Sequence, residues 1–441
     1  MDLAATDPQV EPHTSSSNWS APALLGFRFC IIYFLLFCAL TQIITSFFPV
    51  PNIDVPDPSS FWPFRQITFW VAAHIFRVRH ELVYTGSGSG DKTFDWILAA
   101  WLLAFSALAA AVWSILDRRR TNYSAALKWF RLFLRFALVT QMFAYGMSKV
   151  FPLQMPFPRL NKLVEPFGNF SPMGVLWASI GASTAYEIYA GSIEALAGIL
   201  LVIPQTAMAG ALLCLLASTH VFVLNMVYDV PVKLFSFHLI LMSLFLLAPE
   251  FSRLGNFFLW NRPVPPAVRP PLFHSLRANR ITFVAQILLG VFLLAMNIYV
   301  ARDYWRLYGG GRAQPPLYGI WTVQRQTADG VIRSPLIGDY GRWRRLISDF
   351  PSMIVIQHMD DSFTSYPAIL NSSEKTLTLT SGSDPNWKAV FHFERPARDQ
   401  LILDGTMDGH KVSMQLQLVD RNKFLLVNRG FHWIQEYPFN R

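Results

Sequence analysis

Three long stretches without a charged residue constrain the fold of this chain more than any other feature. They cover residues 29–48, 96–116 and 281–301 and contain 20, 21 and 21 residues. The hydrocarbon core of a bilayer requires about 20 apolar residues in a helix. Each stretch is therefore long enough to cross a membrane once as an α-helix.

Four further apolar stretches are interrupted by polar side chains and bounded by prolines. They cover residues 126–150, 186–203, 206–226 and 232–249. We interpret them as helices as well, because their length and spacing match those of membrane spans. Together the sequence predicts a polytopic α-helical membrane domain of about seven spans, with the lipid bilayer as its first partner.

A long loop over residues 49–93 separates the first two predicted spans. Within it, Phe69–Val83 alternates aromatic and basic side chains, among them Trp70, Phe76 and Arg77. This pattern is typical of a helix that lies in the lipid headgroup region. We expect the segment to lie on the membrane surface rather than to cross the bilayer.

The composition of the chain changes near residue 302. Only 15% of the 441 residues are charged, whereas soluble proteins carry about 25%, and the deficit is confined to the part before residue 302. We therefore predict four parts: a polar N-terminal tail over 1–20, a transmembrane helical domain over 21–301, a linker over 302–318 and an extracytoplasmic β domain over 319–441.

From Gly319 onward the apolar residues alternate with a period of two. Eight or nine short candidate strands follow, the last over Phe424–Val427, and Asp329-Gly330 and Asp408-Gly409 are turn signals between strands. Short strands joined by hairpin turns predict an antiparallel β-barrel or sandwich. The opening Gly319-Ile-Trp321 resembles the entry of lipocalin-like barrels, and we interpret the aromatic run Phe431–Glu436 as a closing strand.

Basic residues in short loops predict the orientation of the spans. With the N-terminus in the cytoplasm, the inner segments 117–128 and 250–280 hold nine Lys and Arg in 43 residues, while the outer loops hold six in 85. Seven spans then place the β domain on the periplasmic side. These basic helix ends and anionic headgroups also explain the net charge of +9, so we expect no nucleic acid partner.

The three cysteines, Cys30, Cys38 and Cys214, all lie in apolar stretches, and no CxxC motif occurs. They are typical of small core residues. The acidic N-terminus lacks the basic region of a signal peptide. These features favour a bacterial inner membrane, although the sequons Asn18-Trp-Ser and Asn371-Ser-Ser leave a eukaryotic host open.

Polar side chains within the predicted spans are the candidate functional residues, because ionisable groups are costly in hydrocarbon. With a rise of about 1.5 Å per residue, several of them fall in the outer half of their helices and could share one pocket. The candidate catalytic residues are Lys149, Glu194, His220 and His238, and the candidate substrate-binding residues are Tyr145, Glu187, Asn225, Asp229 and Lys233.

Structural interpretations of the same residues remain open. A histidine or asparagine in a membrane helix is often a hydrogen-bonding strut between helices, and Lys149 could place its amine at the membrane interface. Glu194 is the hardest to explain structurally, because a buried carboxylate must be paired or protonated. The spacing across three helices does not establish a metal site, and we assign none.

The stretch from Ala144 to Phe251 carries a resemblance. It contains Ala144-Tyr-Gly-Met-Ser-Lys-Val-Phe-Pro152, Ser171-Pro-Met-Gly174, Thr219-His220 and Tyr228-Asp-Val-Pro-Val-Lys-Leu-Phe-Ser236, together with Glu194, Asn225 and His238. The stretch resembles the DoxX/DoxD-like integral membrane family, with a core over 126–251. It is also similar to the horizontally transferred transmembrane (HTTM) domain of vitamin K-dependent γ-carboxylase.

The DoxX resemblance implies association with membrane redox complexes that act on quinones. The carboxylase resemblance implies a lysine base acting on a hydroquinone, which would be Lys149, with His220 as a possible helper. The chain lacks a recognisable peptide-substrate region, so the resemblance does not carry carboxylation of glutamate to this protein.

We therefore expect a membrane oxidoreductase, or a redox-complex subunit, that binds a quinone-like or lipidic substrate. Because the sequence shows no haem, flavin or iron–sulfur signature, electrons would travel on the substrate itself. Whether the protein is itself an enzyme stays open. The alternative is a non-catalytic, membrane-anchored protein for ligand binding or assembly, and transport ranks last because no internal repeat is visible.

Overall fold

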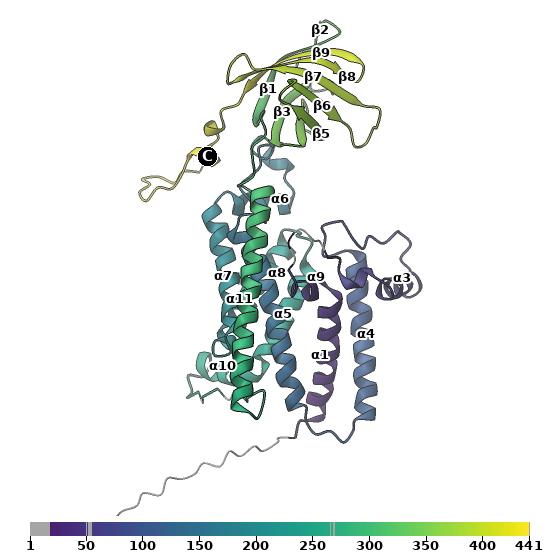
Figure 1. Ribbon diagram of the computed structural model, residues 1–441, viewed down its shortest axis with the longest axis vertical. Helices are drawn as coiled ribbons and strands as arrows, with labels where there is room; N and C mark the ends of the chain where they lie inside the picture. The colour runs from purple at the N-terminus through teal and green to yellow at the C-terminus, as the bar shows by residue number, and fades with distance from the viewer. Residues whose placement is uncertain (1–17, 50, 52–54, 265, 268–269, 441) are drawn as a thin grey trace, which may run out of the picture. The chain divides into compact units, whose positions relative to one another are not determined.

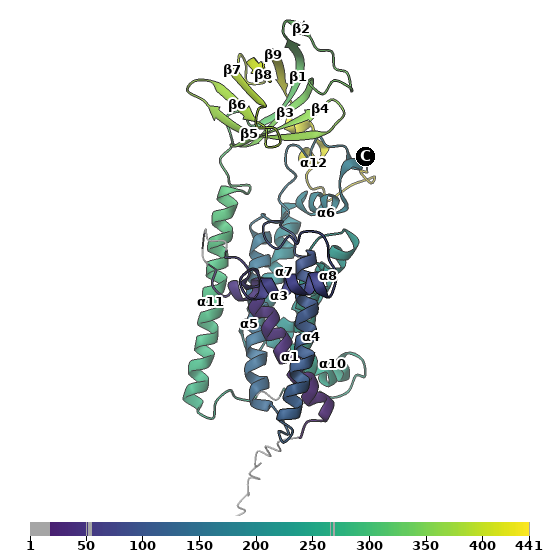
Figure 2. The ribbon, with the colours of Figure 1, turned by 90° about the vertical axis from the view of Figure 1, so that its right-hand side faces the viewer.

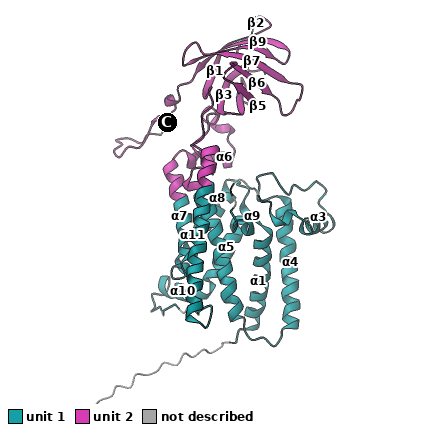
Figure 3. Cartoon of the chain, viewed as in Figure 1, with its two compact units in different colours: residues 1–147, 191–300 teal, residues 148–190, 301–441 magenta. Residues whose placement is uncertain are grey.

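The computed structural model describes residues 18–49, 51, 55–264, 266–267 and 270–440. The chain divides into two compact units (Figure 3). We call residues 1–147 and 191–300 the helical unit, and residues 148–190 and 301–441 the barrel unit. Residues 148–190 therefore group with the C-terminal domain, although the sequence places them among the spans.

The helices alternate in direction through the helical unit (Figures 1 and 2). The helices that precede the barrel are α1 Ala21–Leu40, α2 Gln42–Thr45, α3 Phe64–His74, α4 Thr93–Leu116, α5 Ser124–Val150, α6 Pro172–Gly181, α7 Thr184–Val202, α8 Ala207–Val227, α9 Lys233–Leu247, α10 Phe251–Phe258 and α11 Leu276–Leu307. Of these, α6 lies wholly in the barrel unit. Short 3-10 turns lie at Pro58–Ser60, Phe167–Asn169 and Ala248–Glu250.

Six helices of the described chain are long and apolar enough to cross a membrane. They are α1, α4, α7, α8, α9 with its continuation to Phe258, and α11. This number and length fit an integral membrane protein. All seven predicted helical stretches are present as helices, and the seventh, α5, is long but less apolar than the others.

Helix α5 is the central helix of the helical unit. Its 27 residues include four basic ones, yet every residue from Phe136 to Phe143 is buried. Eight consecutive buried residues cover all sides of a helix, so neighbouring helices surround α5 there. A helix enclosed by protein can carry polar side chains that a lipid-facing helix could not, which explains its composition.

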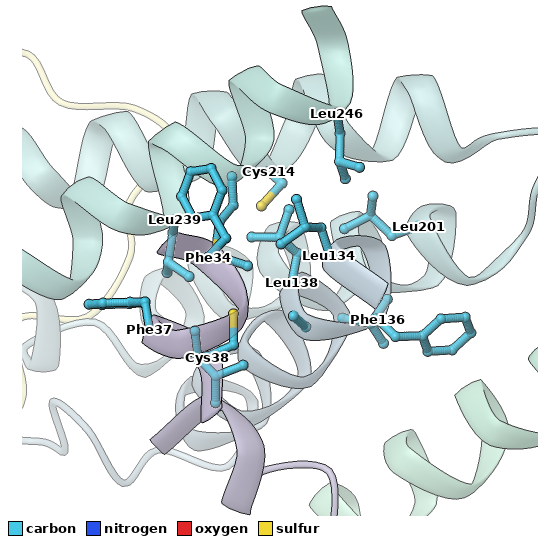
Figure 4. Close-up of a cluster of buried hydrophobic side chains, with 14 of the residues drawn as sticks. Phe34, Phe37, Cys38, Leu134, Phe136, Leu138, Leu201, Cys214, Leu239 and Leu246 are labelled. Atoms are coloured by element: carbon cyan, nitrogen blue, oxygen red, sulfur yellow. The ribbon is translucent and has the colours of Figure 1, made fainter. Parts of the chain in front are cut away.

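The core of the helical unit joins side chains from five helices. Figure 4 shows Phe34, Phe37 and Cys38 of α1 beside α5, α7, α8 and α9. Cys38 and Cys214 are both fully buried, which agrees with their interpretation as small core residues.

The first span begins eight residues earlier than predicted, at Ala21 instead of residue 29. Sequence reasoning treated Arg28 as the end of the apolar stretch. In the structure Arg28 is buried, and its guanidinium donates to Tyr123 Oη at 3.0 Å, Ser114 Oγ at 2.9 Å and the Asp117 carbonyl at 2.9 Å. These bonds satisfy the charge inside the protein, so the helix continues through it.

The C-terminal domain is a closed, eight-stranded antiparallel barrel, with a short ninth strand paired to its first. The strands are β1 Gly319–Ala328, β2 Val331–Ile332, β3 Trp343–Phe350, β4 Met353–His358, β5 Phe363–Asn371, β6 Thr376–Thr380, β7 Lys388–Glu394, β8 Gln400–Met407 and β9 His410–Leu418. Each barrel strand pairs with the next along the chain, and β1 pairs with β9 to close the barrel. Up-and-down barrels of eight strands include the lipocalins, so the predicted fold class is confirmed.

Hairpin turns of two residues set the strand register at two places. Asp329-Gly330 joins β1 to β2, and Asp408-Gly409 joins β8 to β9. All four residues have positive φ angles, between 50° and 81°, as type I′ turns require. Both turns were predicted from the sequence.

Side chains fill the barrel interior. Trp321, Phe391, Leu377, Leu403 and Met414 are each fully buried and belong to one apolar cluster. A side chain without accessible area lines no space large enough for water, so the described interior is packed at these positions. Eight-stranded barrels are just wide enough to be filled in this way.

The predicted strand Phe424–Val427 and the predicted closing strand Phe431–Glu436 are wrong. Residues Leu425–Asn428 form the short helix α12, and the barrel closes without either segment. Both segments had strand-like composition, but β1 already occupies the free edge of β9, and no open strand edge remains for them to extend.

Residues 155–165, between α5 and α6, cover the outer face of β1, β3 and β4 within the barrel unit. Leu160 packs with Ile320 and Ile347, and its amide donates to Asp349 Oδ2 at 3.2 Å. The ring of Phe350 lies between two guanidinium groups, 4.8 Å from Arg159 and 4.2 Å from Arg312. A segment predicted as a plain loop between spans is thus a structural part of the barrel unit.

Candidate functional site

A partly buried polar cluster on α5 is the strongest candidate site in the helical unit. Gln42 Nε2 donates to Tyr145 Oη at 2.8 Å and to Gln141 Oε1 at 3.2 Å. Gln141 is fully buried and also donates to Thr140 Oγ1 at 3.1 Å. Gln141 and Tyr145 are one helical turn apart, so they share a face of α5.

Glu194 of α7 completes this cluster. Its side chain is only 6% exposed, and its carboxylate interacts electrostatically with the phenol of Tyr145. We call Gln42, Gln141, Tyr145 and Glu194 the α5 polar cluster. It combines two carboxamides, a phenol and a carboxylate, which together can donate and accept hydrogen bonds and exchange protons.

A break in the first helix presents Gln42 to this cluster. Helix α1 ends at Leu40, Thr41 has an extended backbone with φ −114° and ψ 177°, and α2 begins at Gln42. The hydroxyl of Thr41 donates back to the Phe37 carbonyl at 2.7 Å. Interrupted helices in membrane proteins are tolerated where the backbone is enclosed by protein, and they often mark binding sites.

A second carboxylate approaches the cluster from the loop that follows α2. Asp57 is exposed, and it also interacts electrostatically with Tyr145. The α5 polar cluster therefore lies near the end of the helical unit where α1 ends and α9 begins.

His238 has a packed and fully hydrogen-bonded imidazole. Its Nδ1 donates to the Leu234 carbonyl at 2.7 Å, which leaves Nε2 to accept from Tyr33 Oη at 2.7 Å. The ring of Phe37 stacks on the imidazole, with centroids 3.8 Å apart and planes at 6°. This geometry is that of a neutral strut between α1 and α9.

Asn225, Asp229 and Lys233 shape the turn between α8 and α9. Asn225 Nδ2 donates to Ser236 Oγ at 3.0 Å and to the Val232 carbonyl at 3.2 Å. Lys233 pairs with Asp229 at 2.9 Å. Asp91 accepts from the amides of Lys233 and Leu234 at 2.8 and 2.9 Å and so caps α9 from a distant loop.

Lys149 and Glu187 lie together in the barrel unit. Lys149 is 5% exposed and Glu187 is fully buried, and the two side chains interact electrostatically. Glu187 Oε1 accepts from the Met155 amide at 2.8 Å, which anchors the segment that covers the barrel. This pair holds the start of α7 next to the loop that follows α5.

His220 is exposed on the surface of α8. Helix α8 is apolar on nearly all sides, so its sequence gives little indication of which face points inward. Among the residues that the structure describes, no group of three or more His, Cys, Asp or Glu side chains is arranged to hold a metal ion.

Sequence reasoning missed Gln42, Asp57 and Tyr33 as partners of the candidate residues. Gln42 carries a signal, because it is an amide near the end of an otherwise apolar stretch. Asp57 and Tyr33 carry none, since an exposed loop acid and a tyrosine in a span are both common.

The helices and the barrel together define an integral membrane protein with a C-terminal β-barrel domain. No family model and no solved structure matches the chain. Uncharacterized protein YwoB of Bacillus subtilis (strain 168) is 32% identical over 127 residues, which cover 27% of this chain and 72% of that protein. The chain belongs to the family of YwoB, whose name states no activity.

Proposed function

We propose that the protein is a membrane oxidoreductase, or a subunit of a membrane redox complex, whose α5 polar cluster binds the head group of a quinone-like or lipidic substrate. The observation that carries the proposal is a polar cluster inside a unit of apolar helices, in which Gln141 and Glu194 are buried and Gln42 and Tyr145 are partly buried. Buried polar groups of this kind inside a membrane domain are functional candidates by default.

The chemistry of the cluster suits a quinone. Reduction of a quinone to a hydroquinone takes two electrons and two protons, and each carbonyl oxygen becomes a hydroxyl. The Gln42 amide can donate to a carbonyl oxygen, while the phenol of Tyr145 and the carboxyl group of Glu194 can accept or release protons. A partner protein in the membrane would supply or remove the electrons.

The resemblance to the DoxX/DoxD-like family, and to the HTTM domain of vitamin K-dependent γ-carboxylase, supports the same proposal. It covers Tyr145 and Glu194, two members of the cluster. The basic residues of the predicted inner loops support a cytoplasmic N-terminus and an extracytoplasmic barrel. The small number of cysteines suits a bacterial inner membrane, in which the barrel would be periplasmic. Lys149 remains a candidate base because of that resemblance. His220 and His238 remain candidate catalytic residues on the basis of the sequence alone.

The test is quinone binding by the full chain in lipid nanodiscs. Organic extraction and mass spectrometry would identify a co-purifying quinone, and titration with a soluble short-chain quinone would give its affinity. We expect quinone binding to weaken by about tenfold or more in Gln42→Leu, which loses a hydrogen-bond donor, and in Glu194→Gln, which loses a charge. Each lost interaction with the quinone should cost about 1.4 kcal/mol or more of binding free energy.

Thr206→Ala provides the matched control. It also removes a partly buried side-chain hydrogen bond, which Thr206 Oγ1 donates to the Leu200 carbonyl at 2.8 Å. This bond lies at the turn between α7 and α8, outside the α5 polar cluster. This variant should bind quinone as the native protein does. Absence of quinone from the purified protein, together with equal affinity in all variants, would reject the proposal.

The alternative proposal is a non-catalytic protein that captures a ligand or partner with its barrel. The filled interior of the barrel does not favour an apolar ligand inside it. An interaction on the outer surface of the barrel stays open under this alternative. Binding of a lipid or protein by the native chain that survives Gln42→Leu and Glu194→Gln would favour it.

A further inference from the structure

The segment that follows β9 exposes an unusual set of large apolar side chains. Trp433 is 90% exposed, Tyr437 84%, Ile434 81% and Phe431 78%, and all residues from 431 to 440 are exposed. Single exposed apolar residues are ordinary, but a contiguous set of this size marks a contact surface. We call residues 425–439 the aromatic tail.

The aromatic tail leaves the barrel at the end where the chain enters it. Leu418, the last residue of β9, pairs with Trp321 near the start of β1, and the Val419 amide donates to the Ile320 carbonyl at 2.8 Å. Arg421 also donates to Tyr318 Oη at 3.4 Å. The tail therefore starts beside the first residues of β1.

The same end of the barrel is joined closely to the last turn of α11. Leu317 is fully buried in the barrel core, and Arg312 forms an ion pair with Asp349 of β3. Within the barrel unit, the short segment from Tyr308 to Tyr318 thus connects the helix directly to the barrel. The tail therefore leaves the barrel at the end where the chain enters it from α11.

The end of α11 has the side chains of a membrane interface. Tyr304 is 37% exposed, Leu307 52% and Tyr308 64%, and Arg302 and Arg306 lie among them. Tyrosine and tryptophan gather where a span meets the lipid headgroups, with basic residues nearby. The bilayer boundary therefore lies close to the C-terminal end of α11.

The charges of the tail also suit a lipid surface. Arg421 and Lys423 directly precede the tail, and Arg429 lies within it two residues before Phe431, against one acid, Glu436. Segments that combine basic and aromatic side chains bind anionic membrane surfaces, with the rings at headgroup depth.

We infer that the aromatic tail is a second membrane contact, which inserts Phe431, Trp433, Ile434 and Tyr437 into the headgroup region of the bilayer that α11 crosses. The tail then adds a second attachment of the chain to the lipid surface, after α11. This inference does not depend on the proposed quinone site, and the two can fail separately.

Collision accessibility of a spin label tests the contact. The full chain would carry Trp433→Cys, labelled with a nitroxide, in nanodiscs that contain phosphatidylglycerol. The matched control is Ile332→Cys, at an apolar residue of β2 that is 56% exposed. Ile332 pairs with Thr327 at the far end of β1, next to the Asp329-Gly330 turn. We expect oxygen to reach label 433 and a water-soluble nickel complex to be excluded, while label 332 shows the reverse.

A second measurement needs no introduced cysteine or label, so it still tests the contact if the labelled variant fails to fold. Phosphatidylcholine brominated on its acyl chains quenches tryptophans in contact with it, and the difference between the native protein and Trp433→Phe isolates Trp433. We expect quenching of this difference signal. The inference would be overturned if the nickel complex reaches label 433 as freely as in water and brominated lipid does not quench Trp433. It would also be overturned if the exclusion of the nickel complex disappears when labelled protein is diluted with unlabelled copies, because that result indicates self-association.

Discussion

At the scale of single residues, His238 shows how a polar side chain is accommodated among apolar helices. Both ring nitrogens have partners, the Leu234 carbonyl and the Tyr33 hydroxyl, and the Phe37 ring covers one face. The sequence predicted a histidine within a span, but it could not identify Tyr33 as its hydrogen-bond partner, because the two residues are 205 positions apart. Whether such a residue is a strut or a catalyst depends on partners that no local pattern identifies.

The first prediction concerns this strut. Tyr33→Phe removes the donor to His238 Nε2 and leaves a buried acceptor unsatisfied, so we expect a loss of about 1–3 kcal/mol of unfolding free energy. Thermal unfolding in detergent micelles would measure it. Tyr186→Phe, at a tyrosine that is 48% exposed, should be close to neutral, and an equal loss in both variants would contradict the assignment.

The second prediction concerns the close approach of α7 and α8. A Cβ atom on Gly210 would lie 2.6 Å from the Leu201 amide nitrogen, and backbone atoms cannot move aside cheaply. We expect Gly210→Ala to cost about 1–3 kcal/mol, as overpacking does. Gly26→Ala, whose Cβ would meet nothing within 4 Å, should be neutral or slightly stabilising in the same unfolding assay. A neutral Gly210→Ala would show that the helices are less tightly packed.

At the scale of elements, the sequence predicted the regular parts well and the contacts between them poorly. The alternation of apolar residues from Gly319 onward specified a series of short strands, and two Asp-Gly pairs specified hairpins. The covering of β1, β3 and β4 by residues 155–165 could not be predicted, because these contacts join segments far apart in the chain. The face of α8 that carries His220 was also undetermined, since nearly all of its sides are apolar.

The third prediction concerns the segment that covers the barrel. Asp349 accepts from the Leu160 amide and pairs with Arg312, and it is only 7% exposed. Asp349→Ala should detach the segment and accelerate hydrogen exchange at Leu160 by about tenfold or more, because a bond to a charged group contributes about 1.5–3 kcal/mol. Asp404→Asn, at an exposed position of β8, should leave this exchange unchanged. Unaltered exchange in Asp349→Ala would contradict the docking.

The fourth prediction concerns pH and the first hairpin. The His410 imidazole, hydrogen-bonded at 2.7 Å, and then the Lys411 amide hold the pKa of Asp329 below its ordinary value. A carboxyl pKa that is lower in the folded state stabilises the hairpin above the unfolded pKa of about 3.9. This contribution is lost as the pH falls through the folded pKa.

His410→Ala should therefore raise the pKa of Asp329 toward its ordinary value in an NMR titration of labelled carboxyl groups. Asp360 is the internal control, because its lowered pKa depends first on the Ser362 hydroxyl. An unchanged Asp329, or an equal shift of both groups, would contradict the assigned cause.

At the scale of the whole molecule, the chain has two units with separate cores. The helical unit is built around an enclosed helix, α5, and the barrel unit around a filled barrel. Composition predicted this division, except that residues 148–190 belong with the barrel. The polar residues that the sequence gathered at one level divide as well: Glu194, His220, Asn225 and His238 lie in the helical unit, and Lys149 lies in the barrel unit.

The fifth prediction tests the central claim, that the α5 polar cluster binds a quinone-like molecule. The full chain in nanodiscs would be illuminated with an azidoquinone, and the labelled peptides mapped by mass spectrometry. We predict labelling of peptides that contain Gln42, Gln141–Tyr145 or Glu194, suppressed by excess unlabelled quinone. Labelling spread over lipid-facing or barrel peptides, and insensitive to excess quinone, would contradict the claim.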